Sequence, residues 1–175
     1  MTDRADHIVV IGSMAAGKTT VGKGIAERLG LDFVDSDDQI RDLTGSSGAE
    51  IAEAEGVDAL HQMELEVFWK AMSAPTPSVI AAAASVIEDA EVREALLRSR
   101  CVWLHAEDDT RRRRRASGSD RREVTEQEAS LLKERDPLFA GCADVRIDTD
   151  AVTEHDAVSI AVAAITERND GRHRI

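Results

Sequence analysis

Two glycines, a lysine and two threonines near the start of the chain could hold a phosphate group. They lie in the stretch GSMAAGKTT, residues 12–20, which directly follows the apolar run HIVVI, residues 7–11. The stretch fits the pattern G-x-x-x-x-G-K-[ST], whose fixed positions are here Gly12, Gly17, Lys18 and Thr19. In this pattern backbone N–H groups curl around phosphate oxygens at the start of a helix, the lysine reaches the β- and γ-phosphates, and the hydroxyl ligates Mg²⁺. The sequence therefore predicts a site for ATP and Mg²⁺, and we expect the nucleotide to contact Gly12, Ala15, Ala16, Gly17, Lys18, Thr19 and Thr20.

A pair of carboxylates follows the second apolar run, LDFV at residues 31–34. Asp35 and Asp37 would project at the carboxyl edge of a parallel sheet, where α/β proteins place their ligands. One could help to hold the hydration shell of the metal, and the other could orient or deprotonate an acceptor hydroxyl. A second interpretation is that these residues only cap a helix that begins near Asp38. The third run, SVIAAAAS at 78–85, lacks the acidic residue of a Walker B strand, which favours a small kinase over a motor ATPase.

Apolar runs alternate with helical patterns along the whole chain, and this alternation is typical of a doubly wound α/β fold with a parallel sheet. The strand-like runs lie at residues 7–11, 31–34, 78–81, 101–104 and 144–147. We expect one helix from the phosphate loop to Gly30, a second around residues 60–68 that ends before the PTP of 75–77, and others near 88–98, 108–115, 125–135 and 154–167. Thr125 and Glu128 form a capping-box pattern for the helix near 125–135.

Composition narrows the class of partner. The chain has 175 residues and a formal net charge of −12, which would repel nucleic acid and anionic lipid at long range. No stretch is long enough to span a bilayer, and the polar start MTDRAD does not have the form of a signal peptide. Cys101 and Cys142 lack metal-ligand spacing and are expected to be buried thiols. We therefore expect a cytoplasmic protein that contacts neither nucleic acid nor membrane.

The assembled pattern resembles the shikimate kinase family from about residue 7 to residue 165. The pieces that carry the resemblance are GSMAAGKTT, FVDSDDQI with TG at 44 and 45, HQMELEV after Gly56, CVWL, and KERDPLF followed by CADVRIDTD. Members are cytoplasmic kinases that use ATP and Mg²⁺ to phosphorylate a hydroxyl of a small cyclic polyol acid. The resemblance implies a P-loop NTPase-type, three-layer α/β/α fold, with a five-stranded parallel sheet of order 2-3-1-4-5 and a short lid.

The resemblance also implies roles for single residues. Asp35 matches an aspartate near Mg²⁺, and Asp37 matches the one that binds the acceptor hydroxyls. Arg135 matches the arginine that grips the acceptor carboxylate. Arg121 and Arg122 are candidates for the lid arginine that neutralises the transferring phosphoryl group.

Three departures from the family pattern fall on the acceptor side. His61 replaces the arginine of the motif GE..FR..E, the family's triple glycine is AAA at residues 82–84, and the lid sequence RPLL is absent near residues 116–124. Loss of a bidentate arginine contact would weaken recognition of a carboxylate by about ten- to a hundred-fold. The acceptor could therefore differ from that of the family, and we expect its site to include Asp37, His61, Ala83 and Arg135.

Two features have a second interpretation. His61 could face the ligand or be a partly buried imidazole whose hydrogen bonds are satisfied within the fold. The run Arg111–Arg115 is preceded by Glu107, Asp108 and Asp109, four residues before successive arginines, which favours ion pairs along a solvated helix. The exception is Arg114, which aligns with a family arginine near the adenine.

The predicted protein is a single P-loop kinase domain at residues 1–168, with a lid at about 116–124 and a flexible tail at 169–175. It would transfer the γ-phosphoryl group of ATP to a hydroxyl of shikimate or a related small metabolite that carries an anionic group, and we expect a monomer. One alternative is a nucleotide-binding protein without kinase turnover. Another is a nucleoside or nucleotide kinase with the same phosphate loop.

Overall fold

The computed structural model describes residues 6–117 and 126–172, with side chains described over 6–116 and 134–167. The predicted lid at about 116–124 therefore lies almost entirely outside the described residues, and so do Arg121 and Arg122. The elements, in chain order, are β1 (Ile8–Ile11), α1 (Lys18–Leu29), β2 (Asp32–Asp35), α2 (Ser36–Thr44), α3 (Gly48–Glu55), α4 (Val57–Met72), β3 (Ser78–Ala81), the 3₁₀ helix η1 (Ala84–Glu88), α5 (Ala90–Arg98), β4 (Arg100–His105), α6 (Asp108–Ser117), α7 (Glu126–Cys142), β5 (Val145–Asp148) and α8 (Glu154–Arg172).

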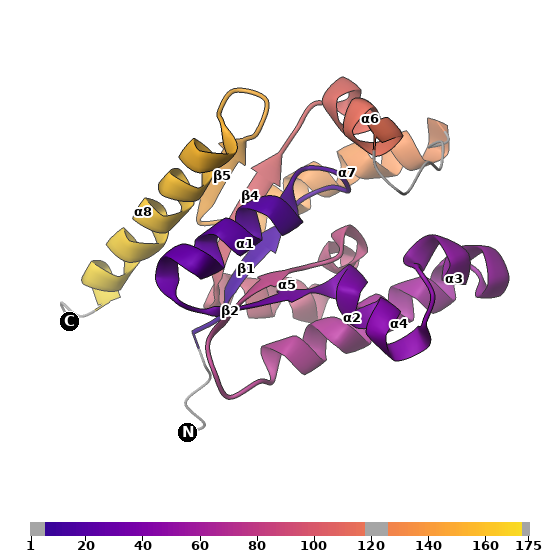
Figure 1. Ribbon diagram of the computed structural model, residues 1–175, viewed down its shortest axis with the longest axis horizontal. Helices are drawn as coiled ribbons and strands as arrows, with labels where there is room; N and C mark the ends of the chain where they lie inside the picture. Colours follow the sequence, from indigo (N-terminus) through magenta and orange to yellow (C-terminus); the bar gives the residue numbers. More distant parts are fainter. Residues whose placement is uncertain (1–5, 118–125, 173–175) are drawn as a thin grey trace.

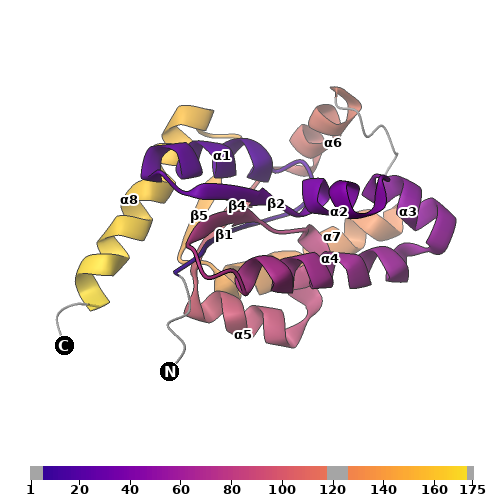
Figure 2. The ribbon, with the colours of Figure 1, turned by 60° about the horizontal axis from the view of Figure 1, so that its bottom comes forward.

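The five strands form one parallel sheet in the order β2-β3-β1-β4-β5, which confirms the predicted topology. β1 and β3 are buried along their whole length, because they lie inside the sheet with helices on both faces. α1 and α8 cover one face around a core that includes Val10, Ile25 and Val158 (Figures 1 and 2). α4, α5 and α7 cover the other face, where Phe68 and Phe139 are fully buried. The result is a three-layer α/β/α arrangement.

Parallel pairing brings the carboxyl ends of all five strands to one edge of the sheet. The phosphate loop follows β1 there, α2 follows β2, η1 follows β3 and α6 follows β4. Residues that are far apart in the sequence are therefore collected at the edge where open α/β sheets bind their ligands.

Three helices differ from the predicted ones. α3 was not predicted, although its Ser47–Glu50 capping box is a sequence signal for a helix start. α7 continues to Cys142 with Pro137 inside it, beyond the predicted end at 135. α8 continues to Arg172, into the segment predicted as a tail. Within the described ranges, none of the helices has the length and apolar character that crossing a membrane requires.

Candidate active site

The loop between β1 and α1 has the backbone geometry of an anion site. Gly12, Ala15 and Gly17 have positive φ angles of 141°, 62° and 100°. Gly17 is the N-cap of α1, and no side chain of the described residues caps this helix. The backbone N–H groups of its first turn are therefore left to an external acceptor, and the helix dipole favours a negative one. This geometry fits the phosphates of a nucleotide.

Lys18 lies over the phosphate loop. Its Nζ donates to the carbonyl oxygen of Gly12 at 2.9 Å and to that of Ser13 at 3.1 Å. Burial lowers the pKa of the Lys18 ammonium, and the negative charges of Asp37, Asp35 and Glu64 oppose this shift. The ammonium is thus placed within the phosphate loop, close enough to three carboxylates for their charges to interact.

Thr19, Asp35 and Asp37 form one hydrogen-bonded chain between α1 and α2. The Thr19 hydroxyl donates to Asp35 Oδ2 at 2.7 Å, and the backbone N–H of Asp37 donates to Asp35 Oδ1 at 2.9 Å. Asp35 is buried and is also the N-cap of α2, so the two interpretations of this residue are compatible. One carboxylate oxygen caps the helix while the other faces the hydroxyl expected near Mg²⁺.

Asp37 lies in the first turn of α2, close enough to Lys18 for their charges to interact. Although part of the side chain is exposed to solvent, the protein around it raises the pKa of the Asp37 carboxyl, and the nearby Lys18 ammonium counteracts this effect. A carboxylate whose pKa is raised in this way is a better proton acceptor than a fully solvated one.

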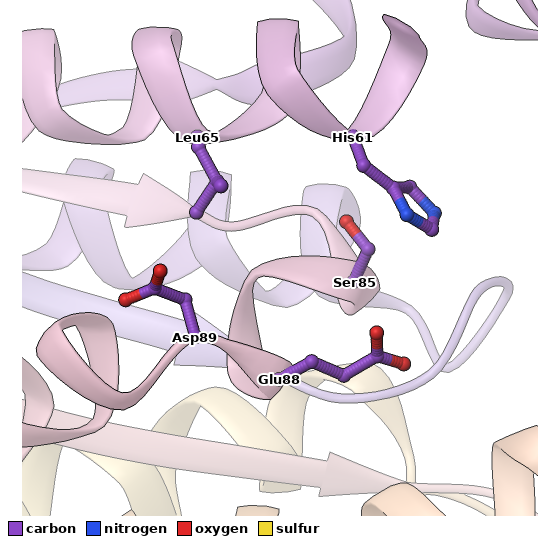
Figure 3. A pocket seen from close by; sticks show the side chains of 5 residues that line it. All are labelled: His61, Leu65, Ser85, Glu88 and Asp89. Atoms are coloured by element: carbon purple, nitrogen blue, oxygen red, sulfur yellow. The ribbon is translucent and has the colours of Figure 1, made fainter. Parts of the chain in front are cut away.

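A cavity of about 220 Å³ lies between α4 and η1. Figure 3 shows the side chains that line it, which are His61, Leu65, Ser85, Glu88 and Asp89. His61 lines this cavity from α4 and is partly buried, so its position is compatible with both interpretations. Ser85 donates to Glu64 Oε2 across the gap between η1 and α4. The predicted acceptor residue Ala83, which precedes η1, is partly buried against the core below.

Arg135 meets a partner that the sequence did not predict. Its Nε donates to Glu88 Oε1 at 2.7 Å, which joins α7 to the end of η1. The Arg135 side chain is only 13% exposed, whereas that of Glu88 is 46% exposed. Spacing in the sequence gives no sign of this pair because 47 residues separate its members.

Two arginines of α6, Arg114 and Arg111, contact the rest of the protein instead of lying on a solvent-exposed face of the helix. Arg114 donates to the backbone oxygen of Ala15 at 3.3 Å and to Thr149 Oγ1 at 3.0 Å, so it links the phosphate loop to the end of β5. Arg111, predicted to be solvated, is buried and pairs with Asp108. The observed ion pairs, including Arg112 with Asp109, span three residues rather than the predicted four. Arg111 lies on the inner side of α6, close enough to Lys18 for their charges to interact.

Substitution of Gly12 tests the loop geometry. A Cβ at this position would clash with the carbonyl oxygen of Leu104, and the φ of 141° is unfavourable for any L side chain. We expect Gly12→Ala to lower the free energy of unfolding by about 2 kcal/mol or more and to abolish nucleotide binding. Urea denaturation and calorimetry with ATP and Mg²⁺ measure the two effects.

Gly141→Ala is the matched control, since a Cβ there meets nothing within 4 Å and φ is not positive. It should leave stability unchanged or raise it by up to about 1 kcal/mol. Equal losses in both variants would show that Gly12 has no special geometric role.

Glu64 allows a test of the electrostatics around Lys18. Burial raises the pKa of the Glu64 carboxyl, and the hydrogen bond from Ser85 opposes the shift. A carboxyl whose pKa is higher in the folded than in the unfolded state destabilises the fold when ionised. We expect Glu64→Gln to raise the melting temperature at neutral pH. This gain should shrink as the pH falls through the raised pKa toward the ordinary value of 4.5, because the wild-type carboxyl is then protonated too.

Melting curves of both proteins across this pH range make the measurement. Glu66→Gln on the exposed face of the same helix is the control and should show no such pH-dependent gain. A Glu64→Gln melting temperature below that of the wild type at neutral pH would contradict the burial of this charge.

The fold and this loop together define a P-loop phosphotransferase. The family model "Shikimate kinase" matches residues 14–166. The chain belongs to the shikimate kinase family, whose members are ATP-dependent phosphotransferases that act on an alcohol group.

Individual relatives agree with the family model. The shikimate kinase of Symbiobacterium thermophilum is 37% identical over 172 residues, which cover 94% of this chain and 98% of the relative. The shikimate kinase of Francisella tularensis subsp. novicida is 33% identical over 165 residues, or 89% of this chain and 92% of the relative. Among solved structures, shikimate kinase from Acinetobacter baumannii in complex with shikimate matches with a TM-score of 0.83, 32% identity and 94% coverage of each chain. The structure from Aquifex aeolicus, at 21% identity and a TM-score of 0.79, shows the same fold.

Proposed function

We propose that this chain transfers the γ-phosphoryl group of ATP to a hydroxyl of shikimate or a related small cyclic polyol. The observation that carries the proposal is the placement of Lys18, Thr19, Asp35 and Asp37 around one phosphate loop. The similar structure from Acinetobacter baumannii contains shikimate and supports an acceptor of this type. The formal net charge of −12 favours such an acceptor over a nucleic acid.

The nucleotide would be held by the phosphate loop, residues 12–20, with Arg114 of α6 beside it. Thr19 and Asp35 would hold Mg²⁺, which would supply positive charge to neutralise the negative charge that develops during transfer. Within residues 6–116 and 134–167 no group of three or more His, Cys, Asp or Glu side chains could hold a metal. This fits Mg²⁺, which usually binds through few protein ligands together with phosphates and water.

The chain's own residues would then act in sequence. Asp37 orients the acceptor hydroxyl toward the γ-phosphate and accepts its proton as the new P–O bond forms, while the bond from the γ-phosphorus to the β-phosphate oxygen breaks and ADP leaves. Lys18 stabilises the negative charge on the transferring group. An arginine of the lid, Arg121 or Arg122, is proposed to do the same. We assign these roles to one domain, residues 1–168, that acts as a cytoplasmic monomer.

A coupled ADP-release assay tests the proposal. The chain, ATP and Mg²⁺ are incubated with shikimate, related cyclic polyols, sugar acids and nucleosides, and we expect ADP only with cyclic polyols. ADP release with nucleosides would favour a nucleoside kinase. Calorimetric binding of ATP without release on any acceptor would favour a nucleotide-binding protein without turnover.

A further inference from the structure

Glu88 lines the cavity and pairs with Arg135, the residue to which the family resemblance assigns the acceptor carboxylate. Its carboxylate accepts a hydrogen bond from Arg135 Nε at 2.7 Å. In the view of Figure 3, Glu88 and His61 extend toward the same end of the cavity, on either side of Ser85. The guanidinium available for a ligand carboxylate thus already has an anionic partner within the chain.

The position of Glu88 is fixed by its backbone. Arg93 Nη1 donates to the carbonyl oxygen of Ile87 at 2.8 Å and to that of Glu88 at 2.7 Å. These bonds hold the junction of η1 and α5, and Asp89 caps α5 by accepting from the backbone N–H of Val92 at 2.9 Å. Arg135 is almost buried on α7, which packs against η1. The ion pair therefore joins two elements that are held in place independently of it.

The charged residues that line the cavity do not favour an anionic ligand. Arg135 is balanced by Glu88 at one end, and Asp89 adds a second carboxylate at the other end, near Leu65. Glu64 lies close enough to interact electrostatically with both His61 and Arg135. A ligand carboxylate would displace or crowd Glu88, and like charges repel more strongly in a partly buried site than in water.

An uncharged ligand meets no such penalty. Hydroxyl groups can donate to the carboxylate oxygens of Glu88 and Asp89 and can accept from or donate to His61. The cavity of about 220 Å³ has a volume suited to a single small ring, since one water occupies about 30 Å³.

We propose that Glu88 is a specificity-determining residue that selects an uncharged polyhydroxylated acceptor and disfavours one with a carboxylate. This inference rests on the proposed function, because it concerns the acceptor side of the same site. The expected acceptor is a cyclic polyol that has no carboxylate. Its ring hydroxyls remain the groups that Asp37 orients.

Shikimate and its methyl ester are matched probes, since they share the ring hydroxyls and differ in the charge of one group. We measure kcat/KM for both with ATP and Mg²⁺ in the wild type, in Glu88→Gln and in the control Glu91→Gln. Glu91 is an exposed residue of α5 that lies outside the cavity lining. We expect the wild type to prefer the ester by roughly tenfold or more, and Glu88→Gln to shift the ratio toward the acid by at least the same factor. Glu91→Gln should keep the wild-type ratio.

A wild type that uses the acid at least as well as the ester overturns the inference, and so does a ratio that Glu88→Gln leaves unchanged. Calorimetry of both probes in the presence of a non-hydrolysable ATP analogue separates the two proposals. Preferential binding of the ester without turnover supports the acceptor class and contradicts the kinase function. Preferential binding of the acid, or failure to bind the ester, contradicts the acceptor class even if ADP is released. If Glu88→Gln does not fold, the wild-type preference alone decides.

Discussion

Lys18→Met is expected to lower kcat by about 10²–10³-fold, the usual effect of removing one positioned group that stabilises transition-state charge. The Lys18 ammonium is held in the phosphate loop by the carbonyl oxygens of Gly12 and Ser13. Burial, which lowers its pKa, also means that the charge is poorly screened by water and acts strongly on a phosphoryl group nearby. Methionine keeps much of the aliphatic stem and removes only the charge and its donors. Steady-state rates at saturating acceptor and nucleotide measure the loss.

Lys23→Met is the matched control for this variant. Lys23 lies on the same helix with its Nζ 5.8 Å from the centre of the Phe33 ring, away from the phosphate loop. Its removal should change kcat by less than about twofold, while circular dichroism confirms that both variants are folded. A Lys18→Met rate within a few fold of the wild type would show that the loop lysine does not stabilise the transferring group.

Asp37→Asn is expected to lower kcat by about 10²–10⁴-fold, the range for loss of a general base. The backbone N–H of residue 37 still donates to Asp35, so the start of α2 should remain intact. Nucleotide binding should be nearly unchanged, because Thr19 and Lys18 keep their contacts. Calorimetry with ATP and Mg²⁺ and steady-state kinetics separate the two effects.

The pH profile gives a second readout for Asp37. The ionised carboxylate is the active form, and its pKa is raised above the ordinary 3.8 by desolvation from the surrounding protein, against the opposing charge of Lys18. The wild-type rate should therefore fall as the pH is lowered through that raised pKa, and the residual rate of Asp37→Asn should lack this limb. Asp38→Asn, which removes an exposed partner of Arg41 at 3.1 Å, should behave like the wild type. Equal losses in the two variants would contradict a specific role for Asp37.

Much of the fold could be predicted because the strands are short apolar runs bounded by helical patterns. β1 and β3 are buried on both faces, and this shows in the sequence as nearly unbroken Val, Ile and Ala. The end of α7 could not be predicted, since Pro137 usually ends a helix and here lies inside one. α3 buries only Ile51, so it has almost no hydrophobic periodicity to detect.

The nucleotide side of the site was more predictable than the acceptor side. Its residues are local in sequence, and their spacing encodes the turn that Gly12 and Gly17 require. The acceptor side depends on long-range contacts such as Glu88 with Arg135 and Ser85 with Glu64, which no local pattern specifies. The inward orientation of Arg111 depends in the same way on how α6 packs, because ion-pair spacing alone cannot tell a buried face from a solvated one.

The most direct test of phosphoryl transfer is ³¹P NMR of a reaction that contains the chain, ATP, Mg²⁺ and either shikimate or its methyl ester. The account predicts that a phosphomonoester resonance grows at the rate at which the γ-phosphate resonance of ATP disappears. If the γ-phosphate is recovered only as inorganic phosphate, or if the ATP resonances persist with both acceptors, the chain is not a kinase of these polyols and the central claim is wrong.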